Sequence, residues 1–334
     1  MAGLHAAVIA ALLLAALSSV LSGAVNLGLR DVMMAIMSPA EASARDVSIL
    51  WSVRLPRTVM AMLVGAGLGI SGAVMQGLFR NSLADPGLTG VSSGAALGAV
   101  TTIVLGQNLL GRSAAYLLPP AAFLGGLLVT FLLYGLATRS GRTSVSMMLL
   151  GGIAIGALSM AATGLLIFIS SEQQLRELTF WSMGSLAGAT WAKVASLLVC
   201  ATIALPFLPL LLRTLDRLSL GEAEAAYMGV NVERSKLAAI TLTALLTGCA
   251  VAVSGVIGFV GLIVPHLLRI GIGPSHRLLL PMSALLGALL MLIADQIARS
   301  IAAPAELPIG IVTAAVGGPV FLWMLMTSAA AEVH

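Results

Sequence analysis

RLPRTVMAMLVGAGLGISGAVMQGLF, residues 54–79, has two arginines at its start and no other charged residue. It is long enough to span a bilayer, which takes about 20 mainly apolar residues in a helix. Gly65 and Gly69, spaced i and i+4, allow another helix to approach closely, as small-xxx-small motifs do in membranes. Gly67 and Gly72 complete a GxGxxG spacing, but no strand precedes it, so it does not indicate a dinucleotide site. The stretch predicts a closely packed membrane helix.

The composition extends this prediction to the whole chain. The 334 residues are 59% hydrophobic and 9% charged, and the mean hydropathy is +1.06. The surface of a soluble domain needs far more charge than this. Only helices or closed barrels satisfy every backbone group in lipid, and the alternating pattern of a barrel is missing from the sequence. We therefore predict an all-α polytopic membrane protein, and the net charge of +4 without basic runs does not favour nucleic-acid binding.

About ten apolar segments follow one another, and we expect them to form one transmembrane domain over residues 1–334. The first half covers about 1–191 and the second about 192–334. Basic residues are nearly balanced between the two faces, so the positive-inside rule does not orient the chain. An even number of crossings puts both termini on one side. The expected segments are 4–26, 57–79, 91–107, 117–138, 145–170, 192–213, 236–256, 258–270, 278–300 and 308–327.

A faint internal repeat relates the two halves. LVGAGLGISGAV, residues 63–74, aligns with LTGCAVAVSGVI, residues 246–257, and matches Ser71 with Ser254 and Gly72 with Gly255. An odd number of predicted crossings separates the two segments, so they would run in opposite directions. Inverted repeats are typical of transporters. Chance similarity between two helices rich in small residues is the alternative.

The candidate chemical groups are few. The sequence contains no GxxxxGK[ST] motif, so any ATPase that drives this protein is a separate chain. Asp295 is the acidic residue that lies well inside an expected helix, and we expect it to pair with Arg299 one turn later. The lack of midplane carboxylates argues against the alternative of an ion-coupled secondary transporter. The histidines have no metal-ligand spacing.

A polar stretch, SLGEAEAAYMGVNVERSK at residues 219–236, interrupts the apolar sequence. Ser219 and Glu222 have the spacing of a capping box. Gly229 is suited to end the short helix, and Asn231 to cap the next one. The stretch predicts a rigid helix–turn–helix outside the membrane, and the alternative is a well-capped loop.

These motifs together resemble the permease subunits of ATP-binding cassette importers for iron siderophores, haem and cobalamin. The resemblance implies ten helices per subunit, a homodimer, two cytoplasmic ATPases and a periplasmic binding protein. It also implies a bacterial inner-membrane location with both termini cytoplasmic. The motifs that carry the resemblance are RLPRTVMAMLVGAGLGISGAVMQGLFRNSLADPGLTGVSSGAALG (54–98), FWSMGSLAGATW (180–191), LGEAEAAYMGV (220–230), SGVIGFVGLIVPHLLR (254–269), GPSHRLLLP (273–281) and AELPIGIVTAAVGGPVFLWML (305–325).

The resemblance also implies roles for individual residues. Three arginines would dock acidic residues of the binding protein, with lipid headgroup anchoring as the alternative: Arg54, Arg57 and Arg299. The coupling helices, about 219–235, would seat in the ATPases through Glu222, Glu224, Tyr227, Met228 and Gly229. The cytoplasmic gate would fall at Asn81, Leu83, Ser144 and Ser146. The fifth and tenth helices would line a pathway between two subunits.

The resemblance implies a bulky chelate as the substrate, and the style of EQQLRELTFWSMGSL (172–186) resembles haem permeases, which favours haem over a ferric siderophore or cobalamin. Arg176 lies at the expected outer mouth, where it could pair with acidic groups of the substrate. Pairing with Glu172 or Glu177 on its own helix is the expected alternative. We expect this chain to bind no cofactor or metal and to be no enzyme, since its partner subunit would use the ATP.

Overall fold

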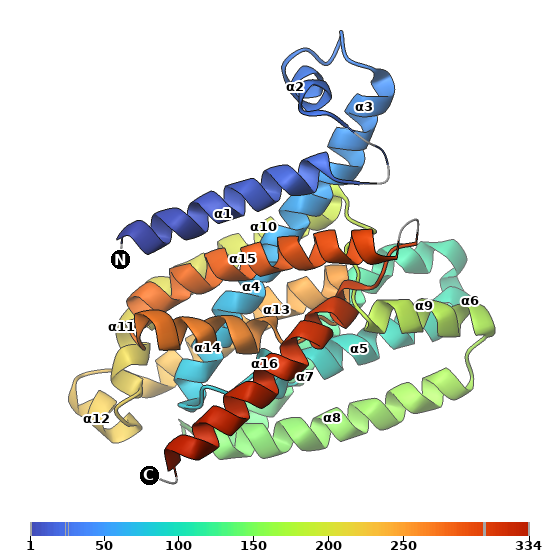
Figure 1. Ribbon diagram of the computed structural model, residues 1–334. Coiled ribbons are helices and arrows are strands. Elements are labelled where there is room, and N and C mark those ends of the chain that lie inside the picture. Colours follow the sequence, from blue (N-terminus) through green and yellow to red (C-terminus); the bar gives the residue numbers. More distant parts are fainter. Residues whose placement is uncertain (1, 24, 26, 303–304, 333–334) are drawn as a thin grey trace.

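The computed structural model describes residues 2–23, 25, 27–302 and 305–332, and it is almost entirely helical (Figure 1). Within these residues, eight helices are long and apolar enough to cross a membrane. Two shorter elements lie where the sequence predicts the other two segments: the apolar helix Val260–Ile272, and Val91–Thr101, which continues into the π-helical turn Thr102–Gly106. The predicted polytopic helical fold is confirmed.

The first half of the chain contains the longest continuous helical run, Ala44–Phe79, which extends α4 beyond the bundle. Its elements are α1 (Ala2–Leu21), α2 (Leu29–Met37), α3 (Ala44–Ile49), η1 (Leu50–Arg54), α4 (Leu55–Phe79), η2 (Pro86–Thr89), α5 (Val91–Thr101), η3 (Thr102–Gly106), α6 (Gln107–Leu110), η4 (Gly111–Ser113), α7 (Ala114–Ala137), β1 (Thr138–Arg139), β2 (Arg142–Thr143), α8 (Val145–Phe168) and α9 (Glu172–Ser182).

The second half is also helical, and a 3-10 turn joins its first two helices. Its elements are α10 (Trp191–Ala204), η5 (Leu205–Phe207), α11 (Leu208–Leu218), α12 (Glu222–Tyr227), α13 (Val232–Ser254), α14 (Val260–Ile272), α15 (His276–Ile301) and α16 (Ile309–Glu332).

Helix α4 lies at the centre of the bundle, packed against α13, α14 and α15. It runs antiparallel to α15, and the two helices keep one register, so that successive turns of α4 contact successive turns of α15. A Cβ atom on Gly65 would collide with the carbonyl oxygen of Gly287, and one on Gly69 with that of Ser283. Glycine is therefore required here for backbone-to-backbone contact, as the i, i+4 spacing predicts.

The two repeated segments lie on α4 and α13, which pack together in opposite directions (Figure 1). The alignment fails at its last glycine. Gly72 lies inside α4, which continues to Phe79, whereas Gly255 has φ 72° and ends α13. The chain after Gly255 turns back toward α14, so the repeat preserves the helix packing but not the helix lengths.

The two ends of the bundle differ in character (Figure 1). Helices α2 and α3 project from one end, which we call the outer end, and α6 and α9 lie at the same end. Helix α12 lies at the opposite, inner end. The first turn of α1 and the last turn of α16 are also at the inner end. Both described ends of the chain thus lie at the same end of the bundle, as an even number of crossings predicts.

Candidate functional site

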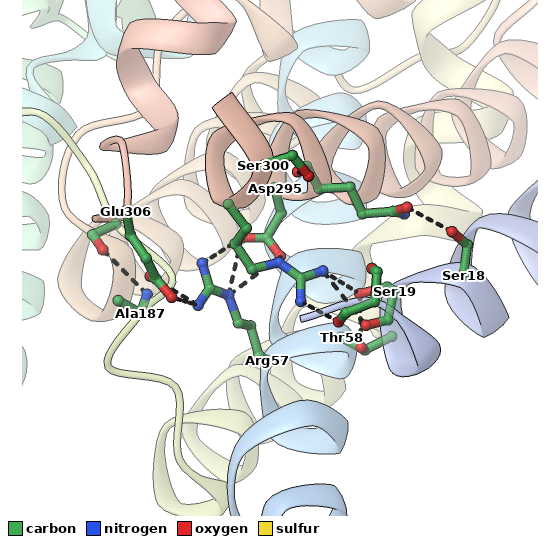
Figure 2. Close-up of polar contacts among 12 residues, drawn as sticks. Ser18, Ser19, Arg57, Thr58, Ala187, Asp295, Ser300 and Glu306 are labelled. Atoms are coloured by element: carbon green, nitrogen blue, oxygen red, sulfur yellow. Dashed lines mark hydrogen bonds and ion pairs between the residues drawn. The ribbon is translucent and has the colours of Figure 1, made fainter. Parts of the chain in front are cut away.

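At the outer end, buried charges join α4 to α15 (Figure 2). Arg57 Nη2 lies 2.9 Å from Asp295 Oδ1 and its Nε lies 3.0 Å from the same oxygen. Its Nη1 donates to Glu306 Oε1 at 2.8 Å. Arg57 is 7% exposed and Asp295 is fully buried. Hydrogen bonds between charged groups are strong in the protein interior. A buried charged group that loses its partner there strongly destabilises the fold.

Arg299 is the second cation beside Asp295. Its Nε lies 3.1 Å from Asp295 Oδ2, so the predicted pair one turn apart is present. Its Nη1 donates to the carbonyl of Ser22 at 3.0 Å. Arg57 was not predicted as the other partner of Asp295, because 238 positions separate the two residues. Opposite charges on two apolar helices are a signal that could have suggested an ion pair. Which residues form that pair depends on the register between the helices.

Arg54 has a different local role. It is 5% exposed and donates to the carbonyls of Val20 and Leu21 at 2.6 and 2.7 Å, and also to that of Val25. The last carbonyls of a helix lack partners within the helix, and a basic side chain can satisfy them. Arg54 therefore caps the C-terminal end of α1. We call Arg54, Arg57, Asp295, Arg299 and Glu306 the outer arginine cluster.

At the inner end, the polar stretch forms the predicted helix–turn–helix, but its start is different. The expected capping box is wrong: Ser219 Oγ donates to the carbonyl of Asp216, and the residue before α12 is Gly221 at φ 135°. The amides of Leu220 and Gly221 bond to Arg217 and Leu218, so the end of α11 extends through this region. Helix α12 consequently begins at Glu222, whose carboxylate accepts a hydrogen bond from Lys236.

The predicted end of α12 is confirmed. Gly229 has φ 79°, and its amide bonds to the Ala226 carbonyl at 2.9 Å. The amide of Val230 bonds to Ala225 at 3.0 Å, which completes a Schellman motif. The Asn231 side chain then accepts a hydrogen bond from the Arg234 amide at 3.0 Å and caps α13, as predicted.

The surface of α12 that faces away from the bundle is exposed. Tyr227 is 93% exposed, and Met228 and Glu224 are also exposed. A helix of fewer than two turns is not stable by itself in water. The caps and the packing of buried Ala225 hold it, so that it presents an aromatic side chain on a fixed support.

The predicted gate residues lie in two loops. Asn81 follows α4, and its Oδ1 accepts a hydrogen bond from the Leu83 amide at 2.9 Å. Leu83 packs on an apolar cluster with residues of α14 and α16. Ser144 caps α8 by accepting from the Met147 amide at 3.3 Å, and Ser146 is exposed in the first turn of α8. A two-stranded hairpin, β1 and β2, leads into Ser144.

Comparison with known proteins identifies the chain. The model of the FecCD transport family matches residues 11–327. The chain belongs to the FecCD transport family. It is 47% identical to the hemin transport system permease protein HmuU of Yersinia pestis, over 94% of this chain and 92% of that protein. It is 43% identical to the cobalamin import system permease protein BtuC of Halobacterium salinarum, over 83% of this chain and 73% of that protein.

A solved structure agrees with this membership. A metal-chelate type ABC transporter in an inward-facing conformation superposes with a TM-score of 0.84 and 36% identity, covering 98% of this chain and all of that one. The FecCD family member described here is thus a multi-pass membrane permease of the ABC importer class.

A second polar network of this FecCD permease was not expected from the sequence. Asp216 on α11 lies 2.6 Å from His276 Nδ1 and accepts the His276 amide at 2.8 Å. Arg269 Nη2 lies 3.2 Å from His276 Nε2, and its Nε donates to Gln76 near the end of α4 at 3.4 Å. The network ties α11 to α15, α14 and α4, and polar residues scattered over four segments gave no periodic signal.

One carboxyl group outside the membrane spans also has a perturbed environment. Asp85 follows the Asn81 loop and accepts the Gly87 amide at 2.7 Å. Burial raises the pKa of the Asp85 carboxyl above its usual range, and this hydrogen bond only partly opposes the effect.

Arg176 of the FecCD permease is exposed on α9 at the outer end. The pairing with Glu172 or Glu177 is not present among the ion pairs of the described residues. Glu177 instead accepts a hydrogen bond from Gln107 Nε2 at 2.7 Å, which directs its carboxylate toward α6. Arg176 therefore extends into solvent, and its proposed role toward substrate stays a prediction.

Replacement of Asp295 by Asn tests the buried charge pair. Two buried arginines would lose their shared anion, so we expect the free energy of unfolding to fall by about 3–5 kcal/mol. The measurement is the thermal unfolding of the purified permease in detergent. Glu306→Gln is the control, because the Glu306 side chain is 42% exposed and water can replace it at a cost of about 1 kcal/mol or less. Equal losses in the two variants would contradict this assignment.

Proposed function

We propose that this FecCD permease is the membrane-spanning subunit of an ATP-driven importer, working with a second copy of itself, two cytoplasmic ATPases and a periplasmic binding protein. The observation that carries the proposal is α12: a short, exposed helix at the inner end, closed by a Schellman motif, in a chain without a P-loop. In this arrangement the inner end faces the cytoplasm of a bacterium and both termini lie on that side.

The exposure of α8 and α16 supports a dimer with a central pathway. Within one subunit, 11% of the apolar span of α8 and 28% of that of α16 is buried, and α1 and α7 are similarly exposed, with 17% and 28% buried. Helices α8 and α16 would then face either lipid or a second subunit. We infer that they line a pathway between two subunits, and that Asn81, Leu83, Ser144 and Ser146 form its cytoplasmic gate.

The proposed substrate is haem, with a ferric siderophore or cobalamin as the alternative. The 47% identity to a hemin permease supports haem, but the cobalamin permease relative follows at 43%. Exposed Arg176 supports a substrate with acidic groups at the outer mouth. The pathway helices α8 and α16 present mainly apolar side chains, which suits brief contact with a bulky chelate.

Uptake into proteoliposomes tests the function and the substrate together. The permease is reconstituted with its ATPase and binding protein, and haem, a ferric siderophore and cobalamin are offered separately. We expect ATP-dependent uptake of haem and none with the permease alone. Uptake of only cobalamin or a siderophore would reject haem while keeping the importer. Uptake by the permease alone under an ion gradient would reject the importer in favour of a secondary transporter.

The binding protein is proposed to dock at the outer arginine cluster through Arg57. Arg54 and Arg299 donate to backbone carbonyls of the chain and hold the outer ends of α1 and α15 in place. Arg57 Nη1 instead points to Glu306, whose side chain is 42% exposed. A carboxylate of the binding protein could exchange with Glu306, since both would be solvated before docking.

Two substitutions in this cluster test docking. Arg57→Gln should weaken the affinity of the binding protein by roughly tenfold or more, because a charged hydrogen-bonded partner is lost. Glu306→Gln should strengthen it, because a competing carboxylate is removed. Affinity is measured by biolayer interferometry on the purified importer, with Arg277→Gln at the inner end as the control of equal charge. Unchanged affinity in both cluster variants would show that docking does not use Arg57.

Tyr227 is proposed to anchor α12 in the ATPase. An exposed tyrosine on a rigid support has the character of an interface hot spot. Tyr227→Ala should therefore weaken ATPase binding to the permease by roughly tenfold or more. Tyr116→Ala is the matched control, because Tyr116 is 85% exposed at the start of α7, at the outer end. Equal ATPase affinity in the two variants, measured by titration in detergent, would contradict the role of α12.

A further inference from the structure

Lys236, in the second turn of α13, is an almost completely buried cation at the inner end. It is 2% exposed, and its Nζ donates to three acceptors. These are Glu222 Oε2 at 2.8 Å, Glu233 Oε1 at 3.1 Å and the carbonyl of Thr143 at 2.7 Å. An ammonium group has three donors, so all of them are used.

The three acceptors of Lys236 come from three elements. Glu222 is the first residue of α12, Glu233 lies in the first turn of α13, and Thr143 is the last residue of β2. Lysine suits this position because its three donors point in different directions, whereas the donors of arginine lie in one plane. Lys236 thus joins the helix that is proposed to meet the ATPase to the hairpin between α7 and α8.

Thr143 is attached to α13 from a second side. Its amide and its Oγ1 donate to Glu233 Oε2 at 3.0 and 2.7 Å. Thr143 is 3% exposed, so both of its donors in these bonds are shielded from water. The next residue is Ser144, which caps α8 and whose amide bonds to the Ala137 carbonyl at 3.0 Å. The start of α8 is therefore fixed to the first turns of α13.

We propose that Lys236 is the positioning residue that transmits a displacement of α12 to the start of α8. This inference rests on the proposed function, in which α12 meets the ATPase and α8 lines the pathway. Charge-assisted hydrogen bonds to a buried ammonium resist separation, because Lys236 Nζ is shielded from the water that would have to replace a departing partner. A movement of Glu222 therefore carries Lys236 with it, and Lys236 carries Thr143 and Ser144.

Replacement of Lys236 by Met tests the transmission. The variant is reconstituted with the ATPase and the binding protein, and ATP hydrolysis and substrate uptake are measured together. Lys236 does not reach the surface, so we expect the ATPase to bind and hydrolyse ATP. Uptake per ATP should fall by roughly tenfold, within the range usual for coupled sites. Lys193→Met, at the only other lysine of the sequence, is the control and should keep the wild-type ratio.

Two further variants separate transmission from folding. Glu222→Ala removes the α12 contact at a side chain that is 43% exposed, and Thr143→Val removes the hydroxyl that donates to Glu233 and also bonds to Thr138 Oγ1. If Lys236→Met does not fold, as judged by thermal unfolding, these variants decide the question. A lowered uptake-to-ATP ratio at wild-type thermal stability supports transmission. Loss of a residue with a merely structural role would lower the thermal stability together with the ratio.

Three outcomes overturn the proposal. The first is an unchanged ratio in a folded Lys236→Met protein. The second is loss of ATPase binding in that variant, which would limit Lys236 to shaping the docking surface. The third is an unchanged ratio in both Glu222→Ala and Thr143→Val. If the wild-type permease neither binds the ATPase nor imports substrate, the proposed function itself is rejected. That result is obtained before any variant is made, so it is distinguishable from failure of the present proposal.

Discussion

Direct backbone contact between α4 and α15 is the constraint on which the rest of the bundle depends. In lipid, burial of apolar side chains does little to favour one helix partner over another, so association relies on close fit and on polar bonds. Gly65 and Gly69 bring α4 against the carbonyls of Gly287 and Ser283. At that separation and in that register, Arg57 comes within hydrogen-bonding distance of Asp295.

The same pair of helices is also in close contact at its inner end. A side chain at Gly77 would collide with the His276 ring, which lies beside Asp216. The membrane interior between these points is held by contact alone, and the charges are concentrated where helices end. This distribution limits the desolvation cost of buried charges, because a buried charge is tolerated only where several partners surround it.

Lys236 and Arg57 solve a similar problem at opposite ends of the bundle. Each is a buried cation that holds groups from separate elements, Glu222 and Thr143 in one case and Asp295 and Glu306 in the other. In both, one carboxylate partner is about four-tenths exposed. We regard that exposed partner as the group through which another protein could act on the buried one.

The class of fold, the number of apolar segments and the local shape of the polar stretch could be predicted from the amino-acid sequence. These follow from composition, segment length and capping residues, which act over a few positions. The end of α12 at Gly229 was predicted for that reason. The start was not, because the choice between Ser219 and Gly221 depended on how far α11 continues.

Which charged residues pair with one another depends on how the helices pack. Asp295 could be paired with Arg299 from the helical period, whereas Arg57 required the register of α4 against α15. Lys236 gave no sign in the sequence that it would be buried, and Arg54 none that it would cap α1. Such contacts join residues that are far apart in the chain, so they are set by packing geometry, which no local pattern encodes.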